Sequence, residues 1–197
     1  MESKDKINAF NTEINYIKNN KYKEYLYNII PLIPDYFFSI AASSTGKYHP
    51  AFSLGEGGLL RHTKAAVRIA YELFQDESIC KFTNDEMDMI IISIILHDTK
   101  KHGENPDLNS KTNNYKFEHP VLAANFVKEN KFNLTDEEIN FISSNINSHM
   151  GPWNTVWSSN VVLDKPKKAA ERFVHMCDYL SSRKFLDVKF ENNEIVM

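Results

Sequence analysis

Four histidines and two aspartates in this 197-residue chain have the side chains that a divalent-metal site needs. Most stand at the end of a predicted helix, so several helices could bring their imidazoles and carboxylates to one shared cavity. Imidazole nitrogen with carboxylate oxygen suits Mn, Fe, Ni, Co or Zn. Such a site can polarise a phosphoryl oxygen and supply hydroxide near neutral pH. The six residues are His62, His97, Asp98, His119, His149 and Asp178.

Each of these residues also has a simpler structural interpretation. His62 lies on an apolar helical stripe and could be a hydrogen-bonded core histidine. His119 could be only an N-terminal helix residue, and His149 could be stabilised by a helix C-terminal dipole. Asp178 is harder to explain in this way, because a buried carboxylate needs a partner. Taken one at a time, the histidines do not identify a metal site.

Helical periodicity dominates the chain that must position these residues. Apolar residues three and four apart predict an amphipathic helix over residues 7–17, and further helices follow over 22–30 and 35–42. A loop over residues 43–57 then leads to a clear helix that begins at Gly58 and carries His62.

Two capping boxes, in which a Glu follows a Thr by three residues, mark the starts of two more helices. Thr83 with Glu86 opens a helix that ends at the pair His97–Asp98, and Thr135 with Glu138 opens the next. The other predicted segments are helices over 118–130 and 167–186, loops over 105–115 and 150–166, and a short strand or frayed tail over 188–197.

No segment alternates with a period of two over more than a few residues, so the predicted fold is all-α. We expect a single helical bundle whose metal ligands converge from several helices. Residues 1–36 should form N-terminal helices that pack on the core, 37–187 the domain that carries the candidate ligands, and 188–197 a C-terminal tail.

Composition limits what the protein can bind. Its formal net charge of -3 provides no general basic field for nucleic acid, so a phosphorylated substrate would need metal ions or a few well-placed lysines. Two cysteines without zinc-finger spacing, and a first segment without an apolar signal region, predict a cytoplasmic protein. The longest apolar run, residues 89–96, is too short to span a bilayer.

Five motifs, in order, resemble those of HD-superfamily metal-dependent phosphohydrolases over about residues 37–186. A bare His-Asp pair would be weak evidence, but five ordered matches are a strong signal. The motifs are GGLLRHT at 57–63, HDTKK at 97–101, His119-Pro120, His149-Met150-Gly151 and HMCDYL at 175–180.

The resemblance implies an HD-domain helical bundle that holds two divalent ions, with Mg as an alternative to the transition metals. A bridging carboxylate, here Asp98, would hold the ions a few ångströms apart and help to orient the attacking water. The minimal ligand set implied by the resemblance is His62, His97, Asp98 and Asp178, to which members with two metals add His119 and His149.

Other polar residues near the motifs have roles that the sequence leaves open. Lys101 stands where the HD signature has its lysine, and could hold a substrate phosphate or be an ordinary solvated lysine. We expect Lys100 and His102 at the surface. Glu171 and His175 could orient a ligand, although His175 could equally serve only helix packing.

The predicted loop after His149 contains both tryptophans of the chain, Trp153 and Trp157. Aromatic rings beside a phosphate site can stack a nucleobase, and they can equally be core or lid packing. The sequence also leaves open which of three cations line the site and which face solvent: Arg172, Arg183 and Lys184.

Within the superfamily, the chain most resembles the HD domain of bacterial 3′–5′ exoribonucleases of the YhaM type. Those enzymes carry an N-terminal OB-type nucleic-acid-binding module, and the residues before position 37 are too few for such a barrel. Their paired histidines ahead of the glycines correspond here only to His49. We therefore expect a substrate smaller than long RNA.

The function expected from the sequence is hydrolysis of a phosphoester of a nucleotide or short oligonucleotide by a metal-bound hydroxide, without a membrane partner. Asp98 and Lys101 are the predicted catalytic residues. Two alternatives use the same scaffold. One is a module that senses a nucleotide without turnover, and the other is an oxygenase with a di-iron centre.

Overall fold

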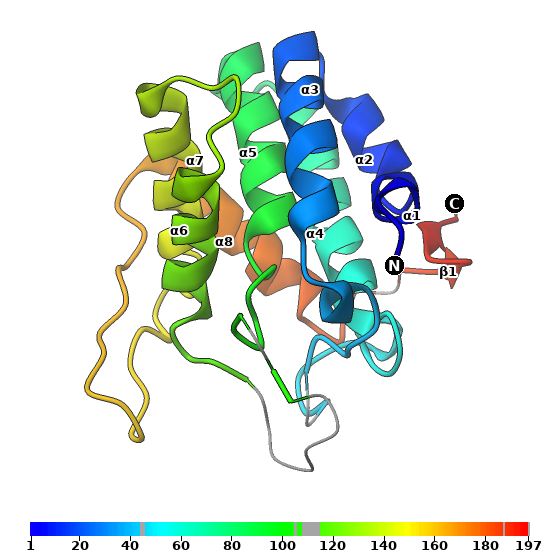
Figure 1. Cartoon of the computed structure of the whole chain (residues 1–197), viewed down its shortest axis with the longest axis vertical. Coiled ribbons are helices and arrows are strands. Elements are labelled where there is room, and N and C mark those ends of the chain that lie inside the picture. The colour runs from blue at the N-terminus through cyan, green and yellow to red at the C-terminus, as the bar shows by residue number, and fades with distance from the viewer. Residues whose placement is uncertain (44–45, 105, 108–114, 187, 197) are drawn as a thin grey trace.

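The computed structural model is a bundle of α-helices with loops gathered at its lower end (Figure 1). It describes every residue except 44–45, 105, 108–114, 187 and 197. The predicted all-α class is confirmed, because β1 and β2 form the only sheet in the described part of the chain. The helices are α1 (Ser3–Asn8), α2 (Asn11–Tyr16), α3 (Asn20–Ile29), α4 (Gly58–Phe74), α5 (Asn84–Leu96), α6 (His119–Glu129), α7 (Asp136–Asn147) and α8 (Ala169–Ser181), and the strands are β1 (Phe190–Glu191) and β2 (Glu194–Ile195).

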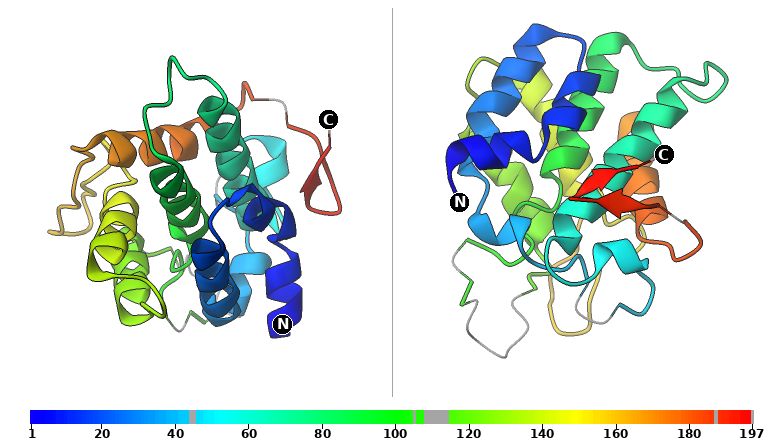
Figure 2. Two further views of the ribbon diagram at one scale, coloured as in Figure 1. Left: turned by 90° about the horizontal axis from the view of Figure 1, so that it is seen from above. Right: turned by 90° about the vertical axis from the view of Figure 1, so that its right-hand side faces the viewer.

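Helix α5 is the central helix of the bundle, as the view from above shows (Figure 2, left). Every residue from Asp88 to Leu96 is buried, and the helix packs against α3, α4, α7 and α8. Its apolar residues therefore belong to the protein core. Among the described residues, none of the helices combines the length and the apolar character that crossing a bilayer requires.

The N-terminal segment was predicted as one helix over residues 7–17, and this prediction is wrong. The chain turns between α1 and α2, at Ala9 and Phe10. The turn lets the fully buried Phe10 ring pack 6.1 Å from the rings of Phe37 and Phe38. A contact with residues distant in sequence therefore overrides the local helical pattern.

The helix predicted over residues 35–42 is also wrong, because only a short 3-10 helix forms there, at Asp35–Phe38. The backbone after it pairs across the loop that leads to α4: Ser39 and Ile40 accept hydrogen bonds from the N–H groups of Gly57 and Leu59, respectively. Because these carbonyl groups already accept hydrogen bonds from the chain before α4, extending the helix would not satisfy any further backbone group there. Within the loop, Ala51–Ser53 forms another 3-10 turn.

The last predicted helix is shorter than expected, since α8 covers Ala169–Ser181 of the predicted 167–186. The tail forms the β1–β2 hairpin beside α4 and the N-terminal helices (Figure 2, right). The fully buried Lys64 of α4 joins these parts: its Nζ lies 2.9 Å from Glu13 Oε2 and 2.8 Å from Glu194 Oε1. The predicted loop over 105–115 falls largely outside the described residues.

Both predicted capping boxes are confirmed. Thr83 N donates to Glu86 Oε2 at 2.8 Å, and Thr135 N donates to Glu138 Oε2 at the same distance. The side chain of each threonine accepts a hydrogen bond in return from the N–H group of its glutamate. The caps stand at the upper ends of α5 and α7, and the lower ends of these helices carry the candidate site (Figure 1).

Glu138→Gln is expected to reduce the free energy of unfolding by about 2 kcal/mol at neutral pH. Burial opposes ionisation of Glu138, but hydrogen bonds from Lys21, Thr135 and Tyr22 outweigh it and lower its pKa from 4.5 to about 2. Since the pKa is lower in the folded state, this stabilisation is present above pH 4.5 and is lost as the pH falls towards 2.

The measurement is urea unfolding of wild type and variant at a series of pH values, where the difference should shrink from pH 4.5 downward. Glu86→Gln is the matched control, because Glu86 occupies the same cap position and, among the described residues, hydrogen-bonds Thr83 alone. An equal loss of stability in the two variants would contradict the assigned role of the Lys21 pair.

Candidate metal centre

Five helices bring the six predicted ligands to one place at the lower end of the bundle (Figure 1). The ligands come from the beginning of α4, the end of α5, the beginning of α6, the turn after α7 and the last turns of α8. The ligand atoms lie within 4.8 Å of one another in each of three groups, which are His62, His97 and Asp98; His97, His149 and Asp178; and Asp98, His119 and His149.

Two glycines allow α4 to begin where it can present His62. Gly57 has a left-handed backbone with φ of 69°, which a residue with a side chain rarely adopts. At Gly58, a Cβ atom would stand 2.3 Å from the Ser53 carbonyl oxygen, so any larger residue would push the chain apart. The Gly-Gly of the sequence motif thus has a direct steric reason here.

The centre is organised around the carboxylate of Asp98, which is 1% exposed. Its Oδ2 lies 3.4 Å from His97 Nε2 and 3.9 Å from His62 Nε2. Its Oδ1 lies 3.0 Å from His119 Nε2 and 3.7 Å from His149 Nε2. The two oxygens of one carboxylate therefore face two different pairs of imidazoles.

Asp178 supplies a second carboxylate on the Oδ2 side of Asp98. Its Oδ1 lies 3.0 Å from His62 Nε2 and 3.6 Å from His97 Nε2. On the other side of Asp98, the Nε2 atoms of His119 and His149 approach to 3.2 Å. Nitrogen atoms this close, both turned towards a carboxylate, are arranged as ligands around a common point.

Backbone carbonyls hold the other ring nitrogen of three of these histidines. Each Nδ1 lies 2.7 Å from the carbonyl oxygen of the residue three positions earlier, and as the carbonyl accepts, the Nδ1–H donates. Nε2 is then left to coordinate a metal, the usual arrangement of metal-bound histidines. The pairs are His97 with Ile94, His119 with Lys116, and His149 with Ile146.

His62 is oriented differently, by a side chain of α8. Its Nδ1 lies 3.1 Å from the fully buried Ser181 Oγ, and this hydroxyl donates to the Asp178 carbonyl at 2.8 Å. Because the one hydroxyl proton is used there, Ser181 Oγ must accept from His62 Nδ1–H. Ser181 was absent from the predicted site, although its position three residues after Asp178 puts it on the same helix face.

The charges of the centre favour a cation. Burial opposes ionisation of both carboxylates. At Asp98, Lys101 and the nearby imidazoles outweigh burial and hold the pKa well below the ordinary range. At Asp178, His62 and His97 have the same effect. Burial lowers the pKa of His149 to about 3, so that its imidazole is neutral. At His97 burial acts in the same direction, but Asp98 and Asp178 outweigh it and raise the pKa to about 10.

Two buried atoms show that the ligand set fits a metal ion. His97 Nε2 and Asp98 Oδ1 form no hydrogen bond with any described residue, although imidazoles and carboxylates approach both. A buried polar atom without a partner is costly, and a coordinated cation would remove that cost. The mixture of four imidazoles and two carboxylates suits a divalent transition metal.

The lysine of the signature lies at this centre, and its neighbours are more buried than predicted. Lys101 forms an ion pair with Asp98 Oδ2 and lines the adjoining pocket. Lys100 was expected at the surface, but it is 6% exposed, bonds Glu104 and lies over the Phe126 ring. His102 is half-buried, with its ring stacked on Tyr36. The Tyr36 hydroxyl, which lies 3.2 Å from the Thr99 carbonyl oxygen and 2.8 Å from that of Gly103, holds the turn after α5 against the rest of the protein.

A pocket of about 300 Å³ opens onto the centre. Arg183 lines it, whereas Arg172 and Lys184 are exposed and outside its lining. Trp153 also lines the pocket and is half-exposed. Trp157 is 98% exposed, so the interpretation of this residue as part of the core is wrong. Other lining residues outside the predicted site are Ala41, Ala42, Met150, Tyr179 and Ser182, and His49 lies here too.

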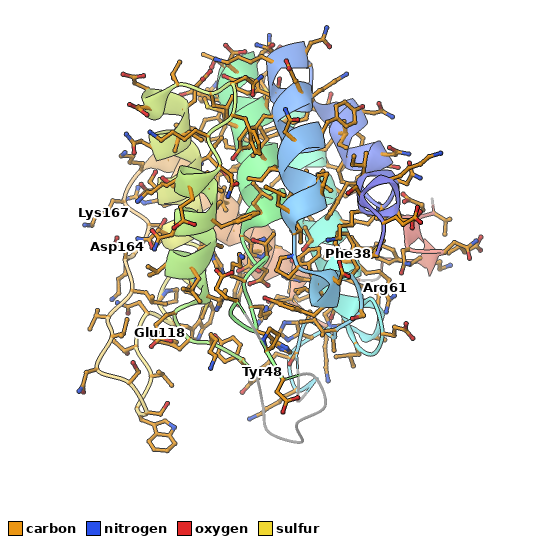
Figure 3. All side chains as sticks on the ribbon, viewed as in Figure 1. Phe38, Tyr48, Arg61, Glu118, Asp164 and Lys167 are labelled. Atoms are coloured by element: carbon orange, nitrogen blue, oxygen red, sulfur yellow. The ribbon has the colours of Figure 1, made fainter. Side chains whose placement is uncertain are left out.

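Of the two residues that could orient a ligand, only His175 contacts one of the predicted ligands. Its Nδ1 donates to the carbonyl oxygen of His149 at 2.7 Å. Gly151 makes room for this contact, since a Cβ atom there would stand 2.3 Å from the His175 ring. Glu171 instead caps α8, accepting hydrogen bonds from the backbone N–H groups of Lys167 and Lys168. Lys167, which marks the position of this cap, lies in the loop before α8. Figure 3 shows it away from Tyr48 and from the lower end of the bundle.

Comparisons with protein-family models, curated proteins and solved structures find no match to the chain. Inference about function therefore rests on the residues of the centre. The structure brings the six predicted ligands together, although 116 positions separate His62 from Asp178. It shows buried groups that could hold a metal ion, and membership of the HD superfamily stays a prediction.

Ser181→Ala is expected to weaken binding of Mn or Zn by about 10- to 100-fold, because the ring of His62 loses the acceptor that selects its tautomer. Isothermal titration of the metal-depleted protein would measure this. Ser93→Ala is the control, since Ser93 is equally buried and bonds Met89 and Asn145 instead of a ligand. Unchanged metal affinity in folded Ser181→Ala would contradict the role assigned to Ser181.

Proposed function

We propose that the chain is a divalent-metal-dependent phosphohydrolase that cleaves a phosphoester of a nucleotide or short oligonucleotide. The observation that carries the proposal is the buried Asp98 carboxylate, whose two oxygens face two different pairs of imidazoles. A carboxylate in this position suits the bridging role that two-metal hydrolases need for in-line displacement. The HD-type motifs of the sequence support the same chemistry.

The donor set supports transition metals as the cofactor. Four imidazoles in a six-residue set favour Mn, Fe, Co, Ni or Zn, because Mg prefers oxygen ligands and retains its water. When bound, two such cations would polarise the phosphoryl oxygen, lower the pKa of a water molecule and offset developing charge. His62, His97 and Asp178 would hold one cation, His119 and His149 the other, and Asp98 both.

The remaining polar residues of the pocket have separate tasks. Asp98, as the carboxylate shared by the two cations, would also help to orient the attacking water. Lys101, at the rim beside Asp98, would hold a phosphate oxygen of the substrate as a point charge. Burial lowers the pKa of His49 to about 4 and that of His102 in the same direction. A lowered pKa disfavours the protonated imidazole, so we expect solvent water to protonate the leaving oxygen.

The proposal is tested with protein that has been depleted of metal and resupplied with Mn, Fe, Co, Ni or Zn. We expect at least one of these metals to restore hydrolysis of a nucleoside monophosphate, cyclic nucleotide or short oligonucleotide. Tight nucleotide binding without product would favour a sensing module. Oxygen consumption by the iron-loaded protein would favour an oxygenase. Either result would overturn the proposal.

Asp98→Asn is expected to reduce kcat by more than about 100-fold and to lower the bound metal content, because a neutral amide cannot bridge two cations. Asp88→Asn is the matched control. Asp88 is equally buried and lies in α5, the helix that leads to Asp98, but it accepts backbone hydrogen bonds from Lys18 and Asn19 at the far end of the bundle. Its variant should lose stability while keeping kcat and metal content. A similar fall in kcat in both variants would show that Asp98 has no special role.

A further inference from the structure

One wall of the pocket consists of two aromatic rings that the protein leaves partly uncovered. The rings of Trp153 and Tyr179 are stacked with an interplanar angle of 13° and a centroid distance of 5.6 Å. Trp153 is 50% exposed and Tyr179 is 36% exposed, and both line the pocket. Exposed aromatic surface inside a concave site is a mark of ligand binding.

This aromatic wall directly adjoins the metal centre. Tyr179 follows the ligand Asp178 in α8, and both line the same pocket. The ring of Trp153 lies 6.0 Å from that of His175, whose Nδ1 donates to the His149 carbonyl. A ligand that lies against the wall can therefore place another part of itself at the cations.

The wall is held in position before any ligand arrives. The guanidinium of Arg183 lies 4.5 Å from the centre of the Tyr179 ring and 5.7 Å from that of Tyr48. Its Nε and Nη2 both donate to Ser182 Oγ, so the guanidinium is fixed at its base as well. Tyr48 lies at the lower end of the bundle, where the loops gather (Figure 3). A fixed aromatic wall binds a flat ligand without a large loss of conformational entropy.

The size and lining of the pocket favour a single nucleotide. The volume of about 300 Å³ is at the small end of ligand pockets, enough for one base with its sugar and phosphate. The small side chains of Ala41 and Ala42 line the same space and leave room beside the rings. Lys101 and Arg183 bring positive charge to it.

We propose that Trp153, whose ring is backed by that of Tyr179, stacks the base of a nucleoside monophosphate whose phosphate group lies beside Lys101 at the metal centre. This inference rests on the proposed function and names its substrate class. Base–aromatic stacking tolerates different bases, because every base has a flat π face, so purine and pyrimidine nucleotides should both bind. A sugar phosphate that lacks the base should bind much more weakly.

The first test measures binding without requiring turnover. Trp157→Phe leaves Trp153 as the single tryptophan, since the chain has only two. Rapid mixing of this variant with adenosine 5′-monophosphate should change the tryptophan fluorescence in a saturable way, and ribose 5-phosphate should not. No saturable change with the nucleotide, or an equal change with the sugar phosphate, would overturn the inference.

The second test compares the two tryptophans in the metal-loaded enzyme. Trp153→Leu is expected to raise KM for adenosine 5′-monophosphate by about 5- to 150-fold, the range that loss of one stacked base implies. Its kcat, and its kcat/KM for ribose 5-phosphate, should change little. Trp157→Leu is the matched control, because Trp157 is in the same loop and lies outside the pocket lining. Equal effects of the two variants would overturn the inference.

Failure of the stacking inference and failure of the proposed function give different results. Hydrolysis of ribose 5-phosphate and of the nucleotide with equal KM would leave the metal-dependent activity intact and overturn the base subsite. A saturable signal from Trp153 with the nucleotide, without hydrolysis under any metal, would support the subsite and overturn the hydrolase.

Discussion

An ionised carboxylate that is removed from water is unstable unless donors or cations surround it. Asp98 imposes this constraint at the lower end of the bundle, where it is 1% exposed and its pKa is held well below the ordinary range. Four imidazoles and the Lys101 ammonium surround it, and they come from the ends of four helices. Helices α4, α5, α6 and α7 must therefore have lengths and relative positions that bring their lower ends together around Asp98. The fold depends on this convergence.

Interactions at the ends of the helices produce much of this convergence. The threonine–glutamate caps fix where α5 and α7 begin, and each helix then runs along the bundle to reach the site. At three of the four histidines, the Nδ1–H donates to a carbonyl three residues earlier, so the helix-end backbone orients the ring. Only His62, in the second turn of α4, needs a side chain from another helix for the same purpose.

The last turns of α8 combine three different tasks in a short segment. Asp178 contributes to the ligand set, Tyr179 forms part of the pocket wall, and Ser181 orients His62. Successive residues of a helix point in directions about 100° apart, so neighbours in sequence can serve different sides of one cavity. The pocket wall therefore keeps a fixed place relative to the metal ligands, because one rigid element carries both.

The sequence alone determined the all-α class, both capping boxes, the start at Gly58 and the identity of the six candidate ligands. These features follow from periodicity, from cap chemistry over four residues and from ordered motifs, all of which are written locally in the chain. Only the tertiary structure decided the turn at Phe10, the short helix after Pro34, the burial of Lys100, the role of Ser181 and the different surroundings of Trp153 and Trp157. Each of these depends on a partner that is distant in sequence, and the folded chain alone brings that partner within contact distance.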